Sequence, residues 1–131
     1  MKISAKNDIN ASAEKIYQLV SSPLNFADFL PPQVERKTCT VDYCEFSIQG
    51  MATFTVKVVE KEPHHYVKYD AENDKNIAIS MEMTIQERGD MQTLLVDINA
   101  EIPLFLSTLV KNPLQNLANM IVEQVKNLTE K

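Results

Sequence analysis

The order in which the hydrophobic pattern of this chain changes its period restricts the fold more than any other feature. Residues 33–102 alternate almost without interruption between apolar and polar side chains, whereas a short passage before them and the segment after Pro103 repeat every three to four residues. Alternation is the signature of strands, and the longer period is that of helices. We therefore predict an α+β protein in which a curved antiparallel sheet of about seven strands wraps around a long C-terminal helix.

The segment before this sheet predicts one strand and two short helices. Residues 2–9 alternate and form the first strand. Ser12 is suited to cap the first helix, and Ser22-Pro23 combines a capping hydroxyl with a proline at the first position of the second. Pro31-Pro32 ends the second helix. Its apolar side chains are Leu24, Phe26, Phe29 and Leu30.

After Pro103 the apolar residues recur at steps of three and four, which predicts a helix that reaches residue 128. Asn112-Pro113 resembles a second helix start, because asparagine is a good cap and proline fits the first position. We therefore expect a short helix over 104–111, a break or a kink before Pro113 and then the main helix. The expected apolar stripe is Leu106, Leu109, Val110, Leu114, Leu117, Met120, Ile121, Val125 and Leu128.

Length and charge limit the function. A chain of 131 residues predicts one domain, residues 1–131. The net charge of −5 disfavours nucleic acid and anionic lipid, both of which need basic clusters. The chain has no apolar run long enough to span a membrane, and its first residues lack the apolar core of a signal peptide. We therefore expect a cytoplasmic location.

Cys39 and Cys44 are the two cysteines of the chain. A two-residue turn at Val41-Asp42 would place them opposite each other on neighbouring strands. Such thiols could bridge, but in a reducing cytosol we expect both to be reduced, small hydrophobic residues. The two histidines, His64 and His65, lie too far along the chain for a local metal site with the cysteines. The sequence therefore predicts no metal and no cofactor.

Three segments together resemble the helix-grip superfamily. They are INASAEKIYQLVSSP, IQGMATFTVKVVEKEP and IPLFLSTLVKNPLQNLANMIVEQV. This superfamily, also called SRPBCC, includes the START lipid-transfer domains, the birch-pollen allergen and the bacterial polyketide cyclase and dehydrase proteins. The whole chain looks like a small bacterial member, although it has no glycine-rich loop between its second and third strands. The resemblance implies a cavity for a small hydrophobic ligand, such as a lipid, polyketide or isoprenoid, and no fixed catalytic residues.

Side-chain parity identifies the expected walls of that cavity. A straight helix cannot touch a curved sheet along its whole length, so we expect a gap near the short helix that carries Phe26 and Phe29. We predict a modest cavity of at most a few hundred Å³, bounded by Phe26, Phe29, Met81, Leu117 and Met120. The complete set of expected ligand-site residues is Phe26, Phe29, Leu30, Phe54, Val56, Tyr69, Ile79, Met81, Val96, Leu117, Met120 and Ile121.

Two alternative functions remain open. A cyclase, dehydratase or hydrolase could use the same cavity if Asn7, His65 and Tyr69 converged there, because acid–base chemistry needs polar groups within hydrogen-bond reach. No other candidate catalytic residues stand out. A protein-interaction module would instead require an exposed apolar patch larger than monomers usually carry. The binding of a small hydrophobic molecule is the function that we favour from the sequence.

Overall fold

A computed structural model describes residues 1–32 and 34–130 of the protein. Its elements are β1 (Lys2–Ile9), α1 (Ala13–Val20), the 3-10 helix η1 (Pro23–Asn25), α2 (Phe26–Phe29), β2 (Glu35–Cys39), β3 (Cys44–Ile48), β4 (Ala52–Glu62), β5 (Tyr66–Asn73), β6 (Ala78–Arg88), β7 (Met91–Glu101) and α3 (Leu104–Thr129). The predicted strand from residue 33 begins outside the described residues. The expected α+β order is confirmed.

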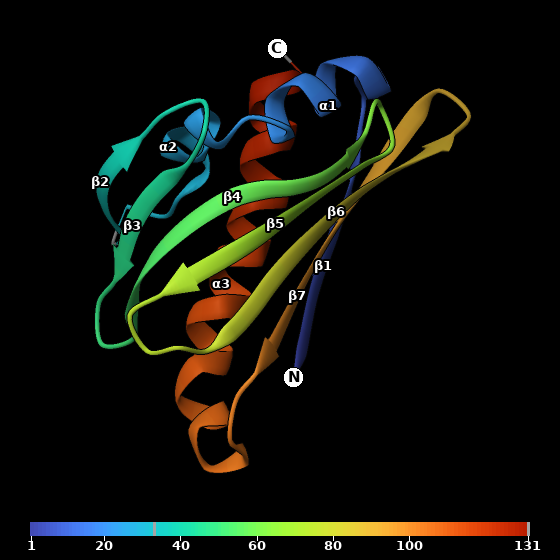
Figure 1. Ribbon diagram of the computed structural model, residues 1–131. Coiled ribbons are helices and arrows are strands. Elements are labelled where there is room, and N and C mark those ends of the chain that lie inside the picture. The colour runs from blue at the N-terminus through green and yellow to red at the C-terminus, as the bar shows by residue number, and fades with distance from the viewer. Residues whose placement is uncertain (33, 131) are drawn as a thin grey trace.

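The strands form one antiparallel sheet with the order β1-β7-β6-β5-β4-β3-β2. Figure 1 shows this sheet curving around α3, with α1 and α2 near the C-terminal end of that helix. α3 packs mainly on β1 and β7, and α2 also packs against it. The parity of the strands is as predicted: Met81, Val96 and Ile98 are buried on the face toward the helix.

α3 is continuous from Leu104 to Thr129, so of the two predicted alternatives the break before Pro113 is wrong. Proline removes one helical N–H, which leaves the carbonyl group of Leu109 without its usual donor. The Leu109 side chain is 71% exposed, so water can reach this position. Val110 and Leu114, on either side of Pro113, are both buried and hold the two parts of the helix on the same core. No helix in the described residues is long and apolar enough to cross a membrane.

The first turns of α3 carry exposed apolar side chains. Leu104, Phe105 and Leu109 are 89%, 78% and 71% exposed, so the expectation that Leu109 belongs to the buried stripe is wrong. Figure 1 shows the reason, because α3 begins beyond the end of the sheet and its first turns have no strand to cover them. Leu106, which we also expected in the stripe, is only half-buried.

The β2–β3 hairpin pairs Cys39 with Cys44 as predicted. The Thr40 N–H donates to the Tyr43 carbonyl group at 2.7 Å, so the next pair outward is of the close, non-hydrogen-bonded kind. The Cα atoms of Cys39 and Cys44 are 3.9 Å apart and a disulfide joins the two residues. The expectation of two reduced thiols is therefore wrong, because it gave the reducing compartment more weight than the predicted proximity of the two residues.

The turn between β5 and β6 depends on one side chain. Asn73 Nδ2 donates to the carbonyl groups of Ala71 and Ile77, at 3.2 and 2.7 Å. Asn73 Oδ1 accepts from the N–H groups of Lys75 and Ile77, at 3.1 and 3.0 Å. A single amide thus satisfies backbone groups on both sides of the turn.

Asn73→Ala should therefore lower the free energy of unfolding by about 2 kcal/mol, because it leaves several half-buried backbone groups without partners. Asn73→Asp keeps an acceptor for the two N–H groups but loses both donated bonds, so we expect a smaller loss. Urea unfolding of the three proteins measures the difference. Equal stability of Asn73→Ala and the wild type would show that water replaces the amide at no cost.

Candidate ligand cavity

A small, wholly apolar cavity lies between the concave face of the sheet and α3. Its volume is about 30 Å³. α3 approaches the sheet mainly over β1 and β7, and the space remains beside it, over the middle strands. The cavity is lined by Phe26 of α2, by Phe46, Ile48, Phe54, Val56, Ala71, Ile79, Met81 and Ile98 of the sheet, and by Leu114 and Leu117 of α3.

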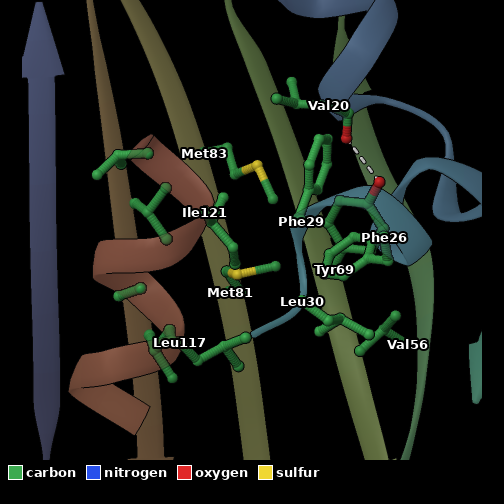
Figure 2. Packing of buried hydrophobic residues seen from close by; sticks show 14 of the residues in the cluster. Val20, Phe26, Phe29, Leu30, Val56, Tyr69, Met81, Met83, Leu117 and Ile121 are labelled. Atoms are coloured by element: carbon green, nitrogen blue, oxygen red, sulfur yellow. Dashed lines mark hydrogen bonds between the residues drawn. The ribbon is translucent and has the colours of Figure 1, made fainter. Parts of the chain in front are cut away.

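Phe26 closes the cavity at the end near α1. Its side chain is completely buried, and its ring lies edge-on to Tyr69 and Phe29, with centroid distances of 4.9 and 5.7 Å. Figure 2 shows these three rings together, with Met81 and Leu117 facing them from the sheet and α3. Asn25 Nδ2 donates to the Leu19 carbonyl group at 2.9 Å, which ties this short helical segment to α1.

Tyr69 has a structural role in this arrangement. Its hydroxyl group donates to the Val20 carbonyl group at 2.6 Å, and the dashed line in Figure 2 marks this bond. Val20 ends α1, where carbonyl groups lack partners within the helix. Burial is the main cause that raises the pKa of Tyr69 well above its ordinary value, so the hydroxyl stays protonated and remains a donor. The bond fixes α1 on β5 and uses the one hydrogen-bond donor of the Tyr69 side chain.

The three polar side chains considered for acid–base chemistry do not come together. His65 is exposed in the turn between β4 and β5. Asn7 is half-buried on β1, which lies three strands away from β5. Three strand spacings amount to about 14 Å, and Tyr69 already donates to Val20. This arrangement does not form the catalytic group that the enzyme alternative requires.

A groove opens to the surface beside the cavity. It has a volume of about 320 Å³ and is lined by Pro31, Val34, Ile48, Gln49, Pro113, Asn116 and Leu117. Ile48 and Leu117 border both the groove and the cavity. Leu117 is only 7% exposed, so it forms a buried part of the wall that the two spaces share. The groove had no signal in the sequence, because its walls come from three separate segments.

The structure divides the expected ligand-site residues into two groups. Those that border the cavity are Phe26, Phe54, Val56, Ile79, Met81 and Leu117. The others belong to the surrounding core, where Phe29, Leu30, Tyr69, Val96 and Ile121 are buried and Met120 is half-buried. The expected ligand-site set did not include five further lining residues, Phe46, Ile48, Ala71, Ile98 and Leu114. Strand parity could have identified Phe46 and Ile48, since they share a face with the buried Cys44.

The volume of the cavity is far below the predicted upper limit of a few hundred Å³. Phe29 and Met120, which were predicted to bound the cavity, do not border it. Large side chains fill the space. Phe46 and Phe54, paired on the neighbouring strands β3 and β4, stack on the sheet wall with their ring centroids 5.6 Å apart, and Phe26 of α2 and Leu117 of α3 border the same space. The gap between a curved sheet and a straight helix exists, but the protein fills most of it with its own side chains.

Comparison with solved structures finds the same fold in bacterial proteins. The protein XoxI from Bacillus cereus superposes with a TM-score of 0.75 at 10% identity, over 98% of this chain and 94% of that one. Protein CV1439 from Chromobacterium violaceum gives 0.73 at 17% identity, over 99% and 97%. The Aha1 dimer from Colwellia psychrerythraea gives 0.67 at 14% identity, over 99% and 96%. No protein-family model and no curated protein matches the sequence. These likenesses establish the fold alone.

Proposed function

We propose that the protein binds a small hydrophobic molecule, such as a lipid, a polyketide or an isoprenoid, between its sheet and α3. One observation carries this proposal: a wholly apolar cavity adjoins an open groove, and Ile48 and Leu117 border both of them. The apolar end of the ligand would occupy the cavity and the rest would lie in the groove. Transfer of its apolar surface out of water would supply most of the affinity.

Binding in this form requires the two spaces to join. The cavity of about 30 Å³ is much smaller than the few hundred Å³ of ordinary ligand sites, whereas the groove of about 320 Å³ is of a suitable size. Leu117 can change its rotamer at little cost compared with a movement of the backbone, because staggered side-chain conformations are close in energy. We infer that Leu117 turns aside when the ligand enters.

The polar side chains of the groove indicate what the outer end of the ligand carries. Gln49 and Asn116 are the polar residues among those that line it, and none of the lining residues is charged. Amides can both donate and accept hydrogen bonds. A neutral hydroxyl, ketone or ester group therefore suits this end better than a phosphate or a carboxylate, which would enter without a cation to pair with.

We also propose that the chain is a member of the helix-grip superfamily. The segments quoted above, the order of its elements and the shared fold of the bacterial neighbours support this assignment. A cavity between the sheet and the last helix is the feature that the assignment would explain.

Leu117→Ala tests the proposal, because it removes the side chain between cavity and groove. We expect the variant to lose about 2–5 kcal/mol of stability and to bind an uncharged environment-sensitive dye such as Nile red more tightly than the wild type. Leu94→Ala is the matched control, since Leu94 is completely buried and does not line the cavity. It should lose similar stability without a gain in dye affinity.

Met81→Trp provides the opposite test. It places a larger side chain in the cavity wall and should reduce dye binding, with an overpacking cost of about 1–3 kcal/mol. Native mass spectrometry of freshly purified protein would identify a retained ligand. Dye binding that is the same in the wild type, Leu117→Ala and Met81→Trp would place the dye elsewhere and refute the site.

A further inference from the structure

We propose that the exposed apolar tip of α3, formed by Leu104, Phe105 and Leu109, inserts into the surface of an uncharged (zwitterionic) lipid bilayer. Docking itself does not depend on the ligand site. Its suggested purpose, the delivery of an apolar molecule to the groove, rests on the proposed function.

The tip is unusual because large apolar side chains rarely stand so far out of a folded protein in a group. The three residues are 89%, 78% and 71% exposed and lie within two turns of one helix. Figure 1 shows that this part of α3 projects past the end of the sheet. An apolar group at a protruding end can insert into a fluid lipid bilayer, which needs no complementary surface.

The area of the tip argues against a second copy of the chain as its partner. Three large side chains at these exposures present roughly 500 Å². A stable protein–protein interface needs about 800 Å² from each partner, and a convex end offers little further contact. Shallow insertion into lipid requires no minimum area, and gives the weak, reversible attachment that a single lipid chain also provides.

The charge around the tip selects the kind of lipid. Over residues 101–113 the charged side chains are Glu101 and Lys111, one of each sign, and the whole chain carries a net charge of −5. Attraction to anionic lipid requires a basic cluster, so this surface suits zwitterionic headgroups. The start of α3 has no capping side chain, and its free N–H groups can donate to the oxygen atoms of those headgroups.

The tip also leads directly to the proposed ligand groove. Phe105, Leu109 and Pro113 follow one another at intervals of four residues, which places them on one side of the helix. Pro113 lines the groove. An apolar molecule that leaves the bilayer beside Phe105 would therefore have an apolar path along α3 to Leu117.

The experiment uses the absence of tryptophan from this chain. Phe105→Trp in the full chain supplies a single fluorophore at the tip, and Val41→Trp supplies one at a distant site of similar exposure, since Val41 is 67% exposed. On titration with phosphatidylcholine vesicles, the emission of the Phe105→Trp protein should shift to shorter wavelength, and that of Val41→Trp should not. Adding Leu109→Asp to Phe105→Trp should weaken partitioning by roughly tenfold or more.

Four results would overturn the inference. They are no shift with Phe105→Trp, an equal shift with Val41→Trp, a shift that appears only with phosphatidylserine, and a shift without vesicles that grows with protein concentration and accompanies dimers in sedimentation. The dye experiment with Leu117→Ala is done without vesicles. A protein that binds the dye and ignores vesicles therefore retains the proposed function and loses only this inference.

Discussion

Replacement of Ile121 by aspartate is expected to abolish cooperative unfolding. Ile121 lies in the middle of α3 and is completely buried against the core. An isolated carboxylate at this position would lose its hydration and gain no partner, at a cost on the order of 4–5 kcal/mol or more. A domain of this size is stable by only about 5–15 kcal/mol, so most or all of the native population should be lost. Circular dichroism during heating would show a broad change without a transition.

Leu109→Asp is the matched control for this substitution. It makes the same chemical change on the same helix, but at a side chain that is 71% exposed, so its melting temperature should stay close to that of the wild type. Similar losses of stability in both variants would show that the low helix propensity of aspartate, and not the burial of its charge, destabilises α3. The packing of α3 on the concave face would then need another explanation.

The sequence allowed the strands to be predicted well because parity is a local property. The alternation over residues 77–85 predicted which side chains of β6 face the core, and Ile79, Met81, Met83 and Ile85 are all buried. The extent of α3 was harder to predict, because the pattern of Leu106 and Leu109 is that of a buried stripe. Whether such residues are buried depends on where the sheet ends, and a helix pattern contains no information on that point.

The candidate site could be predicted in part, for a related reason. Strand parity identified some of the sheet residues that line the cavity, including Phe54, Val56 and Met81. Volume depends instead on how side chains from separate elements share the space, as Phe26 of α2, Phe54 of β4 and Leu117 of α3 do. The groove was beyond prediction, because it joins the segment after α2, the β3–β4 turn and the Pro113 region of α3. Such contacts between distant segments appear only when the chain is folded.

Phe26→Ala should lower the stability of the empty protein and, at the same time, create room for a small apolar ligand. Phe26 is completely buried, contacts Tyr69 and Phe29, and forms one end of the cavity. Its loss should lower the free energy of unfolding by about 3–5 kcal/mol, because the apolar contacts vanish and the neighbouring rings cannot close the space. The same change enlarges a wholly apolar cavity, and apolar cavities of sufficient size stay dry and accept benzene.

Benzene should therefore stabilise the Phe26→Ala protein and have little effect on the wild type, whose cavity of about 30 Å³ is too small for it. A ligand at ten times its dissociation constant adds about 1.4 kcal/mol to the stability of the native state, which a shift of the melting temperature in scanning calorimetry would reveal. Phe105→Ala, at a ring that is 78% exposed, removes the same group without creating a cavity. It should change neither the stability nor the response to benzene. A destabilised Phe26→Ala protein without a benzene response would mean that α2 collapses into the gap, and the cavity would then be too compliant to select a ligand by shape.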